Sequence, residues 1–464
     1  MKMLKKPLVN ALSTALLMPL PALVMQVQAQ EGMLEEIVVT ARRAEESLQD
    51  VPAAVTVLTE SNLDTAGINE FERVVALTPG VTIVTNTTEV GDTQVNIRGV
   101  NGARDAENNI ALVVDGILKT NTAQIAQIHG KLTQAEILKG PQGAYYGRNA
   151  AAGAVVLSTV KPEDEFFGDV KVTAGEENLL TGTVIAGGPL TENSGFSVFA
   201  DYKDFDGFYR NTSPVANARG ATVDAQESLT LGGRIIVEPS ETSEIDMKIR
   251  YADFEGSALS FNPVFHLPGF AAALGDPNFD EDVNSHNYDF IGNIEPESTQ
   301  ETKEFSIKGS WDFETMNVTA WALYSDVDQA WIADSTAATF YRFELTEACR
   351  SSVSALVEQG YQLPSPQVLV EQPFASVYGP FGPTTCDGTQ YQARAQEDIS
   401  AELRLSSLSD GPMSWSVGAY YLTLERDTSV SIAMDTGLDP ILNPYNPPDS
   451  ANHLSLMFAD EFDT

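Results

Sequence analysis

The stretch from Glu136 to Thr159, EILKGPQGAYYGRNAAAGAVVLST, is the part of the sequence whose composition most suggests a binding loop, because it is rich in glycine and small residues. A glycine-rich loop that cradles nucleotide phosphates carries a lysine and then a serine or threonine after its last glycine. Here Ala154 and Val155 follow Gly153. We therefore interpret the glycines as sites of tight turns and close backbone packing, and not as a nucleotide site.

Residues for hydrolytic chemistry do not occur in the patterns that hydrolases use. The sequence has no Gly-x-Ser-x-Gly turn to present a nucleophile and no His-Glu-x-x-His pair to hold zinc. The four histidines, His129, His266, His286 and His453, are scattered among ordinary loop and strand residues, where surface or structural roles are expected. The sequence therefore predicts neither an enzyme nor a cofactor.

Two further groups of side chains could bind or cross-link. Cys349 and Cys386 are the only cysteines, and in an oxidising compartment they predict a disulfide across 36 intervening residues. The acidic run from Asp276 to Asp282 spaces oxygens at every second residue, as calcium loops do. It lacks the glycine at position six and the glutamate at position twelve, so the metal status of the chain stays open.

The N-terminus predicts export. Lys2, Lys5 and Lys6 precede an apolar stretch from Leu8 to Met25, and small residues at Val27 and Ala29 predict cleavage after Ala29, so residues 1–29 are interpreted as a signal peptide. No later window supplies the run of about 18 apolar residues that a spanning helix needs. If the mature chain enters a membrane, it must therefore do so as β-strands.

The charge balance excludes one class of partner. The chain has 27 basic and 65 acidic residues, a formal net charge of −38, which makes nucleic acid an improbable partner. Two interpretations of the acidity remain open: simple solubility, or long solvent-facing loops on an outer surface.

The first part of the mature chain predicts a compact α+β domain over residues 51–160. Its elements include a strand from Ala54 to Leu58, a helix from Asn69 to Leu77, and turns at Pro79-Gly80 and Asp115-Gly116. Before it, within residues 30–50, lies the short apolar run Ile37-Val38-Val39, with no second strand close by to pair with it. Such a segment can add to the sheet edge of another protein, although an ordinary first strand is the alternative.

Beyond about residue 165, apolar residues alternate with polar ones, as in Ile245, Met247, Ile249 and Tyr251. This pattern is typical of strands with lipid on one side and water or polar protein on the other. Nine strands are predicted at 166–175, 179–188, 196–206, 227–238, 244–254, 300–312, 316–327, 394–407 and 413–427, and a tenth begins near His453. Tight turns alternate with long links, as in outer-membrane barrels.

Aromatic residues near the strand ends predict interfacial girdles. They are Tyr202, Phe205, Phe208, Tyr209, Tyr251, Phe254, Trp311 and Phe313.

Three stretches together resemble the TonB-dependent receptor family of the outer membrane. LEEIVVTARR, from Leu34 to Arg43, is similar to the TonB box, with Glu36, Ile37, Val38, Val39, Thr40 and Ala41 as its core. VNIRGV and VVDGI resemble family segments that contain Arg98, Gly99, Asp115 and Gly116. The run from Glu136 to Thr159 resembles the plug signature, with Glu136, Gly140, Pro141, Gly143, Tyr146, Gly147 and Arg148.

The resemblance implies a plug at 51–160 followed by a partial transmembrane β-barrel at 165–464. Family barrels have 22 strands, against the nine or ten counted here, so the resemblance predicts a truncated chain. Residues Thr133, Gln134 and Ala135 depart from the family, where relatives often have a charged pair; if that pair braces plug to barrel, this chain would be braced differently.

The resemblance also implies a function and its partners. It implies uptake of a scarce nutrient at the outer membrane, with an iron chelate such as a ferric siderophore as the first expectation. Cobalamin, a glycan or a non-transporting adhesion role are alternatives. The implied partners are outer-membrane lipid and TonB with its inner-membrane ExbB/ExbD complex. Arg104, in the loop from Asn101 to Asn108, is the predicted ligand contact for an anionic chelate, although a solvated loop charge is the simpler interpretation.

Overall fold

The computed structural model describes residues 38–40, 43, 46–49, 51–66, 68, 71–84, 93–100, 109–212, 220–258, 295–334, 388–408, 413–435 and 453–463, with short pieces between 266 and 290. Residues Val39–Thr464 form one unit by their backbone contacts. Several predictions fall outside the described residues: the signal peptide, Glu36, Ile37, Ala41, Arg104, Cys349, Cys386 and most of the acidic run 276–282.

An N-terminal domain of mixed helices and strands is built from β3 through β9. Its elements are β3 (Ala54–Thr59), α2 (Glu60–Ala66), α3 (Phe71–Ala76), β4 (Val81–Val84), β5 (Gln94–Ile97), β6 (Ile110–Val114), β7 (Ile117–Leu118), η1 (Thr122–Ala126), β8 (Leu132–Lys139), α4 (Gly143–Tyr146) and β9 (Gly153–Thr159). Two short strands precede it, β1 (Val38–Val39) and β2 (Glu46–Ser47). They pair with each other, so the expectation that the apolar run has no second strand close by is wrong. The predicted α+β class is confirmed, and the predicted strand at 54–58 and helix at 69–77 correspond to β3 and α3.

The central sheet of this domain has the order β3-β8-β9-β6-β7, in which β6 and β9 run parallel and the other pairs are antiparallel. Side chains alternate between its two faces. One face packs on α2 and α3 through residues such as Ile137, Val155, Leu63 and Phe71. The other face packs its small and branched residues, among them Val113 and Val156, with Trp321 and Leu323 of a later strand.

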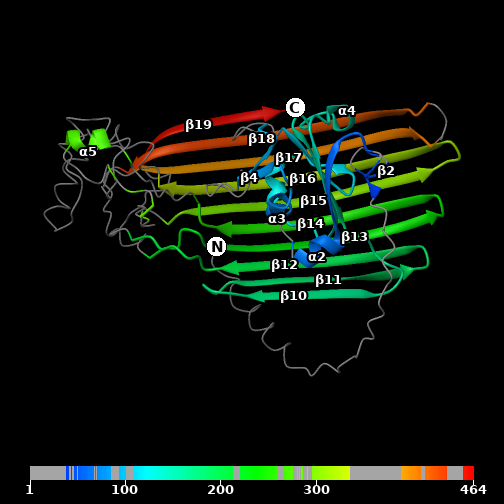
Figure 1. Ribbon diagram of the computed structural model, residues 1–464, viewed down its shortest axis with the longest axis horizontal. Helices are drawn as coiled ribbons and strands as arrows, with labels where there is room; N and C mark the ends of the chain where they lie inside the picture. The colour runs from blue at the N-terminus through cyan, green and yellow to red at the C-terminus, as the bar shows by residue number, and fades with distance from the viewer. Residues whose placement is uncertain are drawn as a thin grey trace, which may run out of the picture. The chain divides into compact units, whose positions relative to one another are not determined.

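The remaining strands form one large sheet, β10 to β19, in which every strand pairs antiparallel with the next along the chain (Figure 1). The strands are β10 (Phe167–Ala174), β11 (Leu180–Thr191), β12 (Ser194–Phe205), β13 (Gln226–Ser240), β14 (Ser243–Gly256), β15 (Glu297–Asp312), β16 (Met316–Asp334), β17 (Gly388–Ser407), β18 (Ser416–Asp435) and β19 (His453–Asp463). All ten predicted strands are confirmed, most of them longer than predicted.

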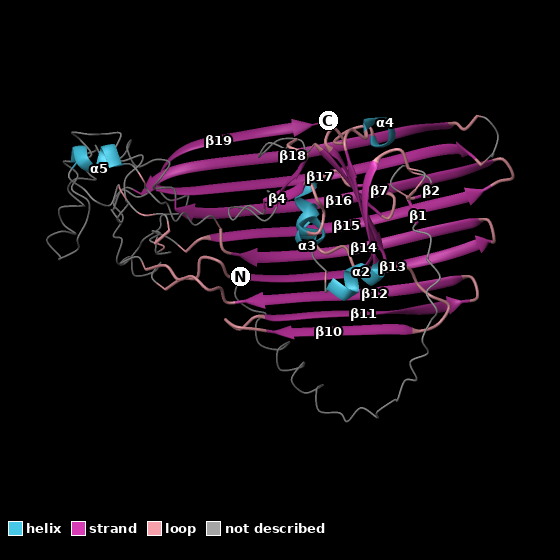
Figure 2. Cartoon of the chain, in the orientation of Figure 1, coloured by secondary structure: helices cyan, strands magenta, loops and turns pink. Residues whose placement is uncertain are grey.

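The connections of the large sheet alternate in length as predicted (Figure 2). Residues 192–193, 241–242 and 313–315 make tight turns, while residues 257–296, 335–387 and 436–452 make long links. The first of these long links contains a short helix, α5 (Pro268–Leu274), that the sequence did not predict. Among the described residues, no helix is both long enough and apolar enough to cross a membrane.

The two faces of the large sheet are inverted relative to a water-soluble sheet. On β14 and β15, the apolar Ile249 and Phe305 are 64% and 50% exposed, while Arg250 and Glu304 on the opposite face are 7% and 6% exposed. A soluble sheet buries its apolar side. We call the two sides the apolar face and the polar face, and the polar face is the one that the N-terminal domain contacts.

The girdle prediction is only partly compatible with this register. Tyr202, Tyr251 and Trp311 alternate with the buried polar residues and so belong to the apolar face. Phe205 and Phe254 lie at positions of the opposite parity, on the polar face, and so cannot meet lipid. The sequence could not separate the two sets, because aromatic residues near strand ends suit either side.

Candidate functional site

The Asp115-Gly116 turn contacts the polar face of the large sheet. Both residues have positive φ, 51° and 84°, as a two-residue hairpin between β6 and β7 requires. The Asp115 carboxylate accepts hydrogen bonds from Thr159 N (2.8 Å) and Thr159 Oγ1 (2.7 Å), and it forms an ion pair with Lys248 of β14. Burial alone would raise the pKa of Asp115, but Lys248 and Arg234 hold it well below its usual range. Asp115 is therefore a buried carboxylate ion.

Arg234 of β13 fixes the end of β9 to the sheet. Its Nε and Nη2 donate to the two oxygens of Asp246 at 3.0 and 2.8 Å, a bidentate pair. Its Nη1 donates to the carbonyl of Val160 at 2.9 Å and to that of Thr159 at 3.1 Å. The guanidinium therefore satisfies backbone groups at the point where the domain ends and the sheet begins.

A second buried carboxylate, Glu304 of β15, receives one cation from each side of the interface. Lys119 of the N-terminal domain donates from Nζ at 2.7 Å, and Arg250 of β14 donates from Nε at 2.6 Å. Arg250 also donates from Nη1 to Gln127 at 2.8 Å. Lys119, Arg250 and Glu304 all have side chains less than a tenth exposed. Removing one member of such a buried group leaves an uncompensated charge, which costs about 3–5 kcal/mol.

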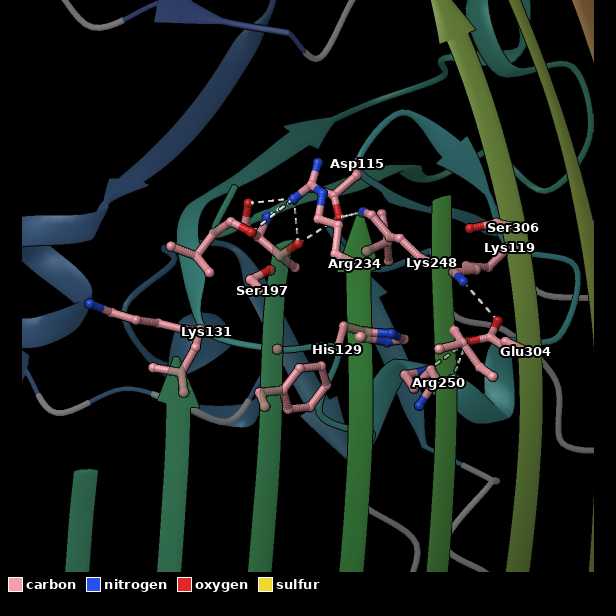
Figure 3. Close-up of a pocket in the computed structure, with 18 residues that line it drawn as sticks. Asp115, Lys119, His129, Lys131, Ser197, Arg234, Lys248, Arg250, Glu304 and Ser306 are labelled. Atoms are coloured by element: carbon pink, nitrogen blue, oxygen red, sulfur yellow. Dashed lines mark hydrogen bonds and ion pairs between the residues drawn. The ribbon is translucent and has the colours of Figure 1, made fainter. Parts of the chain in front are cut away.

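His129 lies beside this second cluster (Figure 3). Burial and the neighbouring charges of Arg250 and Lys119 lower its pKa to about 3, so the ring is neutral at physiological pH. Its Nε2 lies 2.9 Å from the carbonyl of Gln124, which assigns the single ring proton to Nε2. His129 thus acts as a neutral donor within a region of positive potential.

Hydrogen bonds from uncharged side chains of the domain extend the interface across three strands. Thr120 Oγ1 donates to Asp398 of β17 (2.6 Å), Gln124 Nε2 donates to Ser325 of β16 (3.0 Å), and Gln127 Nε2 donates to Thr302 of β15 (3.0 Å). The sequence analysis did not single out these residues, nor Lys119 or the sheet residues Arg234, Lys248, Arg250 and Glu304. The available signal was the occurrence of acids and bases on the polar parity of successive strands.

The predicted TonB-box segment contacts the domain through one buried carboxylate. Thr40 donates from its backbone N (3.0 Å) and from Oγ1 (3.0 Å) to Glu136, whose side chain is fully buried in β8. Val39 is also buried, at 1% exposure. The structure therefore brings together Thr40 and Glu136, two residues that the sequence singled out in separate motifs.

Arg43, just after this segment, reaches the large sheet. It forms an ion pair with Glu402 of β17, and its guanidinium lies 5.0 Å from the centre of the Tyr146 ring. Burial raises the pKa of the Tyr146 hydroxyl. Arg43 has a positive φ of 62°, an uncommon conformation for a non-glycine residue, so the chain turns sharply here.

The signature glycines have different structural reasons. A Cβ on Gly153 would lie 2.1 Å from the carbonyl oxygen of Leu138, so only glycine allows β8 and β9 to approach this closely. Gly140 and Gly147 have φ of 114° and 73°. Gly143 begins α4 in open space and has no such requirement.

The other signature residues lie in separate places. Arg98 and Gly99 turn the chain after β5, and Arg98 Nη1 donates to the carbonyl of Lys139 (3.3 Å), beside Gly140. Pro141 lies between β8 and α4, and Arg148 follows α4. In the part of the chain that the structure describes, these residues contribute to the turns of the domain and not to one catalytic cluster.

The segment from Thr133 to Ala135 does not contact the large sheet through the hydrogen bond that Gln134 makes. Gln134, in the segment that departs from the expected charged pair, donates to Glu136 within the domain (2.9 Å). The contacts with the sheet come instead from Asp115, Lys119, Thr120, Gln124 and Gln127. Over the described ranges, no group of three His, Cys, Asp or Glu side chains is placed to hold a metal ion.

Comparisons with known proteins identify the domain. A family profile described as TonB-dependent Receptor Plug Domain matches residues 47–154. The chain is 28% identical over 213 residues to the vitamin B12 transporter BtuB of Vibrio vulnificus, a match covering 44% of this chain and 33% of that protein. It is 27% identical over 202 residues to the ferripyoverdine receptor of Pseudomonas aeruginosa, covering 42% and 24%.

The solved structures agree on the fold. The pyoverdine outer-membrane receptor FpvA of Pseudomonas aeruginosa, bound to pyoverdine, superposes with a TM-score of 0.63 at 15% identity. The superposition covers 92% of this chain and 56% of that receptor. The matches therefore span a third or less of the length of the curated relatives and just over half of this receptor structure. The large sheet has the same fold as part of that receptor.

Proposed function

Because the chain belongs, through its plug domain, to the TonB-dependent receptor family, we propose that it takes up a scarce nutrient across the bacterial outer membrane. The preferred ligand class is an iron chelate such as a ferric siderophore. The match of residues 47–154 to the plug family carries this proposal. The N-terminal domain is the plug, and the family is one of receptors and not of enzymes.

The inverted large sheet supports the membrane part of the proposal. Its exposed apolar face, which includes Val184, Ile235, Ile249, Phe305 and Leu403, fits the hydrocarbon of a bilayer. Several buried side chains of its polar face, among them Glu304 and Asp398, pair with the N-terminal domain. A sheet with this arrangement is less stable in water, where its large apolar side chains stay hydrated, than in lipid.

The N-terminal segment supports TonB as the source of energy. The outer membrane has no nucleotide supply, so work on the plug must arrive through a partner that reaches across the periplasm. Val38 and Val39 are extended, as pairing with a partner's sheet edge requires. The segment also hydrogen-bonds through Thr40 to Glu136 of β8, the second strand of the plug sheet, so a partner that takes the segment would release this contact.

Cobalamin uptake is the second candidate ligand class. The vitamin B12 transporter of Vibrio vulnificus matches the chain as well as the ferripyoverdine receptor does, at 28% against 27% identity. Both matches lie at a level that supports the family and leaves the ligand to experiment. Iron is preferred because the sequence relatives include a ferripyoverdine receptor and an iron-regulated outer membrane virulence protein.

Uptake and binding, measured separately, test the proposal. Residues 36–41 are replaced by a glycine-serine stretch of equal length in the intact receptor, and a matched control replaces the exposed Glu163-Asp164-Glu165 with serines. We expect cells with the first variant to bind radioactive ferric chelates at the surface and to import none, while the control imports normally. Import by the first variant at the normal rate would refute the TonB role. Import of labelled cobalamin but not iron would select the second candidate.

A further inference from the structure

A small, partly open cavity lies between the N-terminal domain and the large sheet. It has a volume of about 60 Å³ and is lined by residues of the domain and of β11 to β15. Figure 3 shows Asp115, Lys119, His129, Arg234, Arg250 and Glu304 around it. The space exceeds the roughly 10–15 Å³ that one water molecule needs. The cavity can therefore hold a small ion with its companion waters.

The side chains of the cavity carry more positive than negative charge. Three buried cations, Lys119, Arg234 and Arg250, and the partly buried Lys248 line it, against the two carboxylates Asp115 and Glu304. Two further groups adjoin it. Asp246 pairs with Arg234, and Lys308 donates to the backbone carbonyl of Asp115 (3.0 Å) and, among the described residues, to no carboxylate. Five cations thus share three carboxylates.

Other charges nearby do not restore the balance. Lys131, which also lines the cavity, forms an ion pair with Glu60 of α2 (2.9 Å). Lys161 pairs with Glu244 at 2.8 Å. Two other carboxylates on the polar face, Asp201 and Asp398, accept from Thr183 and Thr120 at 2.6 Å each, and neither lines the cavity. The excess of positive charge is therefore local, in a chain whose overall charge is −38.

Two observations indicate that this region attracts anions. The same cations that line the cavity help to hold His129 neutral, so the local potential opposes an added proton. The hydroxyls of Ser197 and Ser306 line the cavity, and the hydrogen bonds found among the described residues engage neither of them. Free hydroxyl donors beside excess cations are the groups that a small anion needs.

We propose that this cavity is a binding site for a small inorganic anion of about chloride size. The anion neutralises the cations that three carboxylates leave uncompensated, and it accepts hydrogen bonds from the cavity wall. Because the wall comes from both the N-terminal domain and the large sheet, the bound anion holds the two together. It would leave when they separate. The site does not depend on the proposed transport function, and binding is measured without TonB or a transported ligand.

Equilibrium dialysis of the intact protein in detergent with radioactive chloride, at constant ionic strength set by gluconate, tests the site. We expect one chloride per chain. Lys119→Gln removes a lining cation but leaves Arg250 on Glu304, and should weaken chloride binding about tenfold, equivalent to 1.4 kcal/mol. Lys119→Arg keeps the charge and should restore binding. Lys303→Gln, an equal charge change on the apolar face of β15, should have no effect.

Absence of saturable chloride binding by the wild-type protein would overturn the proposal, as would an equal loss in Lys119→Gln and Lys303→Gln. If Lys119→Gln fails to fold, crystals of the wild-type protein grown in bromide decide the matter. An anomalous scattering peak in the cavity supports the site. A cavity without one, in crystals that show bromide elsewhere, rejects it.

Discussion

The N-terminal part of the chain is held in two places, and the two differ in construction. At the interface with β13 to β15, each of the buried carboxylates Asp115 and Glu304 receives several donors from both sides. At the N-terminal segment, the exposed Thr40 rests on the single carboxylate of Glu136, and Arg43 makes one ion pair with the large sheet. The first is a dense buried network, and the second consists of a few bonds.

The difference indicates that the interface and the N-terminal segment have different roles. A network of buried charges is costly to break because every removed partner leaves another charge unsatisfied. A partly exposed contact of a few hydrogen bonds to one carboxylate is worth about 1.5–3 kcal/mol per bond and can be exchanged for bonds to a partner. The interface is therefore suited to keep the plug in position, while the N-terminal segment is suited to be released first.

The largest expected effect comes from breaking the interface. Asp115→Ala leaves Lys248 without its nearest carboxylate and Thr159 without its acceptor. We expect the N-terminal domain to lose about 3–5 kcal/mol of stability, measured as the denaturant concentration at which it becomes sensitive to protease. Asp164→Ala, at an exposed position, is the matched control and should change stability by less than about 0.5 kcal/mol. Similar losses in both variants would contradict this difference in roles.

A backbone variant tests β8, the strand that carries Glu136. In Gly153→Ala the added Cβ would meet the Leu138 carbonyl at 2.1 Å, so β8 and β9 must separate. We expect a loss of about 1–3 kcal/mol in the stability of the N-terminal domain. Gly143→Ala, where the Cβ meets nothing within 4 Å, should leave the unfolding midpoint unchanged. Equal unfolding midpoints for the two alanine variants would contradict the requirement for glycine at position 153.

The pH dependence of stability isolates His129. Its pKa is about 3 when folded and near its ordinary 6.5 when unfolded, so below pH 6.5 only the unfolded chain takes up the proton. Stability should therefore fall by roughly 1.4 kcal/mol per pH unit as the pH drops from 6.5 towards 4.5. His129→Gln should flatten this slope, and His266→Gln, which changes an exposed ring, should not. An unchanged slope in His129→Gln would assign the effect to other groups.

The smallest effect concerns the N-terminal segment. Glu136→Gln removes the charge that accepts from Thr40, while leaving the side chain similar in size. The segment should then be detached from β8 for a larger fraction of the time. The periplasmic domain of TonB should therefore bind about three- to tenfold more tightly. Calorimetric titration measures this change, with Asp164→Asn as the control. Weaker binding in Glu136→Gln would mean that Glu136 presents the segment and does not restrain it.

The sequence predicted the architecture because period-two alternation and turn residues are local signals. The alternation of Ile245, Met247 and Ile249 with Asp246, Lys248 and Arg250 was sufficient to predict a two-faced strand. The turns at Asp115-Gly116 and in the glycine-rich run could also be predicted from the sequence, because positive φ restricts the residue types that a turn accepts.

The interface itself could not be predicted from one sequence. Lys119 and Glu304 are separated by 185 positions, and nothing local to either residue indicates the other. The sequence marks Glu136 as a signature residue, but it does not indicate that the Glu136 carboxylate accepts a hydrogen bond from Thr40. Likewise, Phe254 and Tyr251 looked equally suited to a girdle, and only the strand register put them on opposite faces.

Titration of the periplasmic domain of TonB into the purified protein tests the central claim most directly. Replacement of residues 36–41 should abolish binding, while Asp115→Ala, which damages the interface but leaves the segment intact, should bind as tightly as the wild-type protein. Undiminished binding by the protein that lacks residues 36–41 would contradict the account, because TonB would then be attached elsewhere on the chain.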